Sequence, residues 1–391
     1  MPSFGHPMLS HWALDPGVLY LNHGTVGAAP RRALAAQQAI RDEMERQPSR
    51  FLLREVSGLA GRPRAEPTRI RVAAEAVARF VGARGDDVVF VDNATTGVNA
   101  ILRSFPLQPG DELLVTDHTY GAVARTAAFV ARDRRVTVRT VTVPYPAFDR
   151  ARFVEAVASA IGPRTRIAVV DHISSESALI FPVAEIAAVC RARGVALVID
   201  GAHVPGVLPL DVPAIGADWY VANLHKWAHA PQSCGFLWAH PSRQASLHPA
   251  VISWGYELGY CAEFDWIGTR DPSAWLAAPE GLAFLHELGF DDVRRYNHDL
   301  AVNAARMLAD RWGTRFDIDD ADIGFMATVP MPDRCGTTGD DAARVRDRLL
   351  FDHGIEVQVH AAHGRLWARI SAQVYNEMSD YERLGEAALK T

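Results

Sequence analysis

The sequence predicts an α/β protein with a mainly parallel, seven-stranded sheet, helices on both faces, and a smaller α+β domain. Short apolar runs alternate with longer stretches rich in Ala, Arg and Glu through the middle of the chain. This alternation is typical of a parallel sheet with crossover helices. The runs are almost continuously apolar, as expected for strands buried on both faces. After about residue 255 the pattern changes to long helical segments mixed with a few strands.

Seven apolar runs supply the predicted strands, at residues 88–91, 112–116, 136–143, 166–172, 195–200, 219–224 and 235–240. Helix-like segments separate several of them. One is AEIAAVCRARG (184–194), in which the final glycine is a helix stop signal.

The C-terminal part has its own pattern. Residues 291–312 form a long amphipathic segment, and strands are predicted within 326–332, 355–360 and 366–371. A chain of 391 residues exceeds the size of one hydrophobic core, so two closely packed domains are expected. We predict an N-terminal segment (1–16) that packs on the small domain, a large domain (17–265), and a linking helix with the small domain (266–391).

Composition excludes several classes of function. The net charge of -6 argues against a general nucleic-acid or anionic-membrane surface. No apolar run approaches the ~20 residues that span a bilayer, and no signal peptide is visible. The four cysteines (Cys190, Cys234, Cys261, Cys335) show no CxxC spacing, so neither a zinc cluster nor a disulfide framework is implied. We therefore expect a cytoplasmic protein without nucleic-acid or membrane partners.

Two residues at strand ends indicate chemistry. Asp200 ends the run VALVID, and Lys226 follows the next run in NLHKW. Side chains at the carboxyl ends of parallel strands face the ligand crevice. The alternative to a role in chemistry is that Asp200 is an ordinary turn residue and Lys226 an ordinary exposed lysine. A buried lysine has a lowered pKa, as Schiff-base lysines need, and a buried carboxylate keeps a pyridine nitrogen protonated. Together they suggest pyridoxal phosphate (PLP) chemistry.

A phosphate site is predicted in DNATTG (92–97), which follows the first strand and leads into a helix-like segment. Backbone and hydroxyl donors at a helix N-terminus bind phosphate. The same residues also form a good helix cap, so the motif alone leaves both interpretations open. His225 and His229 have the i, i+4 spacing of a metal site but no accompanying HExxH glutamate, and no metal is expected.

An ordered series of motifs now carries a resemblance: DNATTG, DHTYGA, DHISSESALIFPV, VIDGAHVPG, NLHKW, GTRDPS and RISAQVYN. It resembles the class-V aminotransferase family of fold-type-I PLP enzymes. The segments LNHGTVGAAPRRAL, FLLRE and HKW…GTRDPS most resemble its isopenicillin N epimerase-like branch. The match runs from about Leu19 to Tyr375. It implies the fold-type-I PLP-dependent transferase architecture and a homodimer with shared active sites.

The resemblance implies roles for individual residues around the cofactor. Lys226 would form the Schiff base, Asp200 would pair with the pyridine nitrogen, and His203 would lie near the phenolic oxygen. Tyr120 would stack on the ring. The phosphate would be held by Thr95, the backbone at Ala94 and Thr96, Asn223, His225, and Thr269 of the partner subunit.

On the substrate side, the resemblance implies that Arg369 binds the α-carboxylate, for which a planar guanidinium is suited; a structural salt bridge is the alternative. Asn22 and His23 would lie at the mouth of the site, and Ser175 near the substrate carboxylate. The residues Arg54, Trp254, Tyr256 and Arg270 either line a specificity pocket or make structural contacts.

The reaction stays open at this point. An epimerase is favoured slightly over a C–S β-lyase that acts on a cysteine conjugate or sulfoxide, and an aminotransferase ranks lower. Cysteine desulfurases of this family carry a cysteine on a loop just before the arginine strand. The corresponding segment here, IEVQVHAAHGRLWARIS, contains no cysteine, so a desulfurase is disfavoured. A PLP-binding module without activity ranks last.

Overall fold

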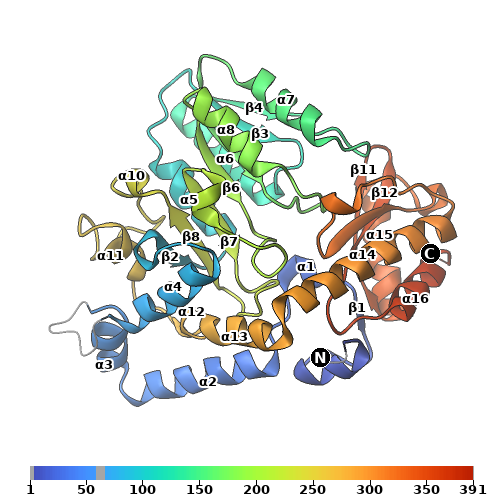
Figure 1. Cartoon of the computed structure of the whole chain (residues 1–391), viewed down its shortest axis with the longest axis horizontal. Helices are drawn as coiled ribbons and strands as arrows, with labels where there is room; N and C mark the ends of the chain where they lie inside the picture. Colours follow the sequence, from blue (N-terminus) through green and yellow to red (C-terminus); the bar gives the residue numbers. More distant parts are fainter. Residues whose placement is uncertain (1–3, 59–66, 391) are drawn as a thin grey trace.

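The computed structural model describes residues 4–58 and 67–390. A seven-stranded sheet forms the centre of the larger part of the molecule (Figure 1). Its strands are β2 (Val88–Val91), β3 (Glu112–Thr116), β4 (Thr137–Val141), β5 (Thr165–Asp171), β6 (Ala196–Asp200), β7 (Trp219–Asn223) and β8 (Gly235–Ala239). All seven lie within or overlap the predicted runs, so the predicted sheet is confirmed.

The strand order is β2-β8-β7-β6-β5-β3-β4, and in this sheet β8 runs antiparallel to both its neighbours. The remaining pairs are parallel. The carboxyl ends of β5, β6 and β7 therefore lie side by side, at the edge where ligands bind in such sheets.

Alternate residues of the strands belong to two separate hydrophobic clusters, one on each face of the sheet. Val88 and Phe90 pack with α4, α7 and α8 on one face, whereas Val89 and Val91 pack with α5 and α6 on the other. This explains the continuous apolar runs, because both side-chain sets of a strand are buried. The helices are α4 (Arg69–Phe80), α5 (Ala94–Ser104), α6 (Gly121–Arg134), α7 (Arg150–Ala160) and α8 (Val183–Ala192).

Shorter and peripheral elements complete this part of the chain. They are β1 (Leu19–Tyr20), α1 (His23–Val26), α2 (Arg31–Arg46), α3 (Pro48–Arg50), α9 (Val212–Ile215), α10 (Pro241–Gln244), α11 (Tyr260–Asp265), α12 (Ser273–Leu276) and α13 (Ala278–Leu288). None of the described helices is both long and apolar enough to cross a membrane.

A second, smaller domain lies beside the first (Figure 1). It contains the long helix α14 (Phe290–Trp312), β9 (Met326–Pro330), α15 (Gly339–His353), β10 (Ile355–Glu356), β11 (Gln358–Ala362), β12 (Arg365–Ser371) and α16 (Met378–Ala388). The antiparallel sheet β11-β12-β9 packs against these helices. Helices α14 and α15 each end at a left-handed glycine, Gly313 and Gly354.

The N-terminal segment contacts the small domain through Gly5, whose N–H donates to the carbonyl of Val374 at 2.7 Å, and through His6, which bonds to Asp380. Farther on, β1 pairs in parallel with β10. Residues 1–3 of this segment lie outside the described part of the chain. The boundaries at residues 16 and 265 stay a prediction.

Candidate active site

A pocket of about 190 Å³ opens at the carboxyl ends of β5, β6 and β7. It is lined by Thr25, Asn93, Ala94, Thr95, Tyr120, Asp171, Ser175, Asp200, Ala202, His203, Asn223, His225 and Lys226. Nine residues of the predicted site are in this set, although they are spread over more than a hundred positions of the sequence. The pocket is the candidate active site.

Lys226 follows β7 and is buried in the pocket. Its Nζ lies 3.1 Å from Nε2 of His203. Burial, aided by the Arg369 guanidinium, lowers the pKa of Lys226 to about 7, while Asp200 and Asp171 act in the opposite direction. Burial also lowers the pKa of His203 well below its usual range. At neutral pH the pocket thus holds a neutral imidazole beside an amine that readily gives up its proton.

Two carboxyls lie at the base of the pocket. Asp200 ends β6 and accepts a hydrogen bond from the N–H of Ala202 at 3.0 Å. Burial raises its pKa to about 6. Asp171 ends the neighbouring strand β5 and pairs with Asp200 in register. Asp200 was predicted from its position at the end of an apolar run, and Asp171 has the same position but was not predicted.

Helix α5 directs its N-terminus toward the pocket. Its cap is Asn93, whose Oδ1 accepts from the N–H of Thr96 at 2.9 Å. The N–H of Ala94 donates to Asn223 Oδ1 at 2.8 Å. Two predicted phosphate donors, the backbone N–H groups of Ala94 and Thr96, are therefore engaged within the protein, and Thr96 does not line the pocket. Thr95 remains as the predicted hydroxyl that does.

Two further predicted residues line the pocket. Tyr120 directly precedes α6 and is 46% exposed, so its ring is accessible from the pocket. His225 is held by a hydrogen bond between its Nδ1 and the carbonyl of Cys234 at 2.8 Å. Burial lowers the pKa of His225 to about 4, so its ring is neutral.

Arg369 approaches the pocket from β12 of the small domain. Its Nη1 donates to the carbonyl of Ser175 at 2.6 Å, and its Nη2 donates to Thr25 Oγ1 at 2.5 Å and Asn22 Oδ1 at 3.3 Å. Ser175 and Thr25 line the pocket. Burial lowers the pKa of Arg369 to about 10, which still leaves it charged at neutral pH. The predicted substrate-side residues Arg369, Asn22 and Ser175 are therefore brought together.

The prediction that His23 lies at the mouth of the site is wrong. Its ring is fully buried and packs at a tilted angle against Trp227, with a centroid distance of 4.7 Å. One nitrogen bonds to the hydroxyl of Tyr375 and the other to the carbonyl of Lys226, each at 2.9 Å. His23 does not line the pocket, and with both nitrogens hydrogen-bonded it supports the segment that carries Lys226.

Comparison with known proteins shows the family to which the chain belongs. The model of the family described as aminotransferase class-V matches residues 42–343, most of the chain. The chain belongs to the class-V aminotransferase family. It is 35% identical to an isopenicillin N epimerase of Streptomyces clavuligerus, over 96% of this chain and 95% of that protein.

Two other similarities are informative. The chain is 36% identical to a putative L-cysteine desulfhydrase 1 of Oryza sativa subsp. japonica, covering 96% of this chain and 83% of that protein. Among solved structures, a variant of C-DES with glycine covalently linked to its PLP cofactor superposes with a TM-score of 0.78 at 19% identity, over 98% of each chain. At this low identity, the structural match to C-DES shows a shared fold. Pyridoxal phosphate is the cofactor of this class-V aminotransferase family member.

The pocket fits that cofactor. A PLP site requires an amine for the aldehyde, an acid for the ring nitrogen and donors for the phosphate. Here a buried lysine, a buried aspartate and the N-terminus of α5 line one pocket. Nδ1 of His203 is buried without a hydrogen-bond partner among the described residues, which leaves polar capacity for a bound group.

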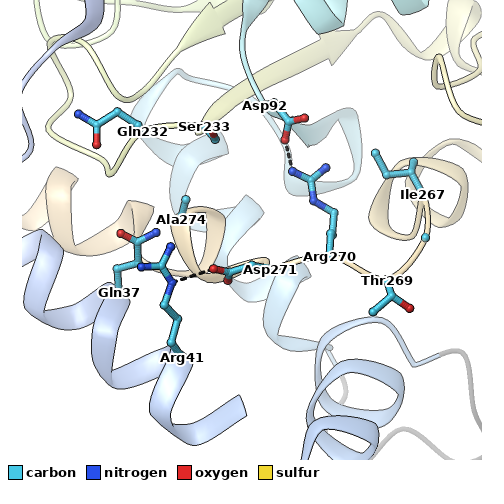
Figure 2. A pocket seen from close by; sticks show the side chains of 11 residues that line it. Gln37, Arg41, Asp92, Gln232, Ser233, Ile267, Thr269, Arg270, Asp271 and Ala274 are labelled. Atoms are coloured by element: carbon cyan, nitrogen blue, oxygen red, sulfur yellow. Dashed lines mark hydrogen bonds and ion pairs between the residues drawn. The ribbon is translucent and has the colours of Figure 1, made fainter. Parts of the chain in front are cut away.

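Thr269 lies outside this pocket. It is exposed and lines a second cavity of about 390 Å³ with Arg41, Asp92 and Asp271 (Figure 2). There Arg270 pairs with Asp92 and lies over the ring of Trp275, 4.0 Å from its centroid. Arg270 thus makes the structural contact that was the alternative to a specificity role. Trp254, Tyr256 and Arg54 do not line the Lys226 pocket either.

Four lining residues were missed from the sequence: Thr25, Asn93, Asp171 and Ala202. Asp171 carried a usable signal, because it ends an apolar run in the same way as Asp200 does. Thr25 had none, since its contact with Arg369 joins residues 344 positions apart.

Proposed function

We propose that this class-V aminotransferase family member moves the Cα proton of an amino acid, as an epimerase of the isopenicillin N epimerase kind. The observation that carries the proposal is the buried Lys226 amine, with a pKa of about 7, in one pocket with Asp200. Bound PLP draws electrons away from Cα of an attached amino acid. A lysine with a pKa of about 7 is present in part as the neutral amine at pH 7, and this form can accept the Cα proton.

The remaining roles follow from position in the pocket. Lys226 binds the cofactor, Asp200 holds the proton on the ring nitrogen, and His203 lies beside Lys226 as a neutral hydrogen-bonding partner. Thr95 and His225 bind phosphate, while Asn223 shapes this turn by fixing Ala94. Arg369 binds the substrate carboxylate, and Asn22 and Ser175 orient its guanidinium.

Epimerisation needs a second acid on the face opposite Lys226. Tyr120 is the residue we assign to this step. Its side chain lines the pocket and is half exposed, whereas His225 is held by the Cys234 carbonyl. A phenol can return a proton to Cα on the opposite face.

A C–S β-lyase is the second candidate, supported by the similarity to the putative L-cysteine desulfhydrase. The same loss of the Cα proton precedes both outcomes. A desulfurase is disfavoured, because none of the four cysteines lines the pocket. Burial raises the pKa of Cys261 to about 11 and that of Cys234 further, so neither is a ready nucleophile.

The test is incubation of the PLP-loaded enzyme with L-amino acids and cysteine conjugates in heavy water. Deuterium at Cα together with inversion supports the epimerase. Release of pyruvate and ammonia without inversion identifies the lyase. If neither deuterium nor elimination product forms with any substrate, the proposal of Cα proton transfer fails. The variant Lys226→Ala is the control and should remove either activity.

We also propose a cytoplasmic homodimer in which Thr269 reaches the phosphate of the partner's site. Thr269 is exposed and away from the pocket of its own chain, and Trp254 nearby in sequence is 82% exposed. Val251, Ile252, Tyr256 and Leu258 around it are exposed as well, and a group of exposed apolar side chains is typical of a surface that is covered in an assembly. Light scattering should give twice the chain mass. A monomeric mass would contradict the homodimer. Unchanged affinity for PLP in Thr269→Ala would contradict the role of Thr269 at the phosphate.

A further inference from the structure

Asp171 is a second acid in the pocket that the proposed mechanism does not use. It pairs in register with Asp200 across the parallel strands β5 and β6, so both side chains project from the same face of the sheet. Both line the pocket with Lys226, and each is 3% exposed. Two buried carboxyls therefore lie next to each other at the base of one site.

Each carboxyl accepts a backbone hydrogen bond, Asp200 from the N–H of Ala202 and Asp171 from the N–H of Tyr120. In the described part of the chain, Oδ2 of Asp171 nevertheless has no hydrogen-bond partner, although it is buried. An ionised oxygen without a donor is costly in a buried site, whereas a protonated oxygen is itself a donor. The geometry favours a proton on Asp171.

The charges around the pair point the same way. Lys226 is the cation that faces both acids, and Arg369 is bound to Ser175, Thr25 and Asn22. The other titratable neighbours, His203, His172 and Tyr220, are kept neutral by burial. Two adjacent carboxyls with one such cation do not both ionise near neutral pH. Burial and the charge of Asp200 raise the pKa of Asp171 well above its usual range.

We propose that Asp171 is a positioning residue that stays protonated and donates a hydrogen bond toward the carboxylate of Asp200, so that the base of the pocket carries a single negative charge. The inference rests on the proposed function only in assigning Asp200 to the cofactor ring. The location of the proton is a property of the protein itself and is measurable without PLP.

The first test is infrared spectroscopy of the protein without added cofactor at pH 7.5. Wild type should show the C=O stretching band of a protonated buried carboxylic acid, and Asp171→Asn should lack it. Asp265→Asn is the matched control: the side chain of Asp265 is also largely buried, at 11% exposed, but it pairs with Arg71 and should be ionised at this pH. No such band in wild type, or an unchanged band in Asp171→Asn, overturns the proposal.

The second test uses the PLP-loaded enzyme and the pH midpoint of its visible absorbance. Asp171→Asn replaces one neutral group by another, so the midpoint should stay within about 0.3 units of wild type. If Asp171 were ionised, loss of its charge near Lys226 would lower the midpoint by about one unit, which would overturn the proposal. Asp171→Leu removes the donor and should shift the midpoint, provided that its melting temperature matches wild type. Failure to bind PLP would refute the proposed function and leave the infrared result intact.

Discussion

The amine of Lys226 and the ring of His203 lie 3.1 Å apart in a pocket where burial lowers the pKa of both groups, that of Lys226 to about 7. A neutral imidazole can accept a hydrogen bond from an ammonium or donate one to an amine. His203 can therefore stay bonded to Lys226 in either state of the lysine. This pairing has a direct consequence for mutation.

Replacing His203 should affect activity according to the hydrogen bond that is kept. His203→Ala leaves the amine of Lys226 without this partner and should lower kcat by about 10- to 100-fold, since a buried hydrogen bond contributes about 1–3 kcal/mol. His203→Gln retains a neutral partner and should lose less than about 10-fold. Steady-state kinetics across pH checks this. Equal losses in both variants would show that His203 acts only through packing.

The buried lysine should also make stability depend on pH. Its folded pKa of about 7 is below the unfolded value of 10.5, so between these values the unfolded chain binds the extra proton. Stability then rises as pH increases from 7 toward 10.5, whereas below pH 7 the cost of burying the charge is fully present. Relative to Lys226→Met, wild type without cofactor should gain about 3 kcal/mol between pH 7 and 10. Urea denaturation at a series of pH values measures the difference. Parallel curves for the two proteins would rule out a shifted lysine.

Arg369 should control substrate binding more than turnover. Arg369→Leu removes the guanidinium and should raise KM for an amino acid about 100-fold, as expected for loss of a charged, bidentate hydrogen bond. Arg369→Lys keeps the charge but not the planar fork, so an intermediate KM is expected. An unchanged KM in the leucine variant would assign Arg369 to a structural role with Ser175 and Thr25.

The sequence was sufficient to predict the sheet because each strand is buried on both faces and therefore continuously apolar. It could not show that β8 runs antiparallel. In the structure, residues 224–234 join β7 to β8 without a helix, and a parallel connection needs a crossover that such a short segment does not provide. Direction was thus decided by the connection, which apolar patterning does not report.

The site was predictable where chemistry follows a strand end. Asp200 and Lys226 have this position, and so does Asp171, although it was not recognised. His23 was misplaced because its partners, Tyr375 and the carbonyl of Lys226, are 352 and 203 residues away in sequence. The phosphate donors were overassigned for a related reason: the side chains of Asn223 and Asn93 occupy the N–H groups of Ala94 and Thr96.

His23 should prove to be a stability residue. His23→Ala leaves the Tyr375 hydroxyl and the Lys226 carbonyl without partners and opens a cavity, so it should cost about 2–4 kcal/mol of unfolding free energy. His286→Ala, at an exposed position of α13, is the control and should change stability by less than about 0.5 kcal/mol. Similar melting temperatures for the two variants would contradict the buried hydrogen-bonded role of His23.

The most direct test of the central claim is borohydride reduction of the PLP-loaded protein followed by peptide mass mapping. The chain has two lysines, Lys226 in the pocket and Lys390 exposed near the C-terminus, so the outcome is unambiguous. We predict that the reduced cofactor is found on the peptide that contains Lys226, that Lys390→Arg is labelled as wild type is, and that Lys226→Arg is not labelled. Cofactor fixed on Lys390, or labelling that survives in Lys226→Arg, would contradict the account.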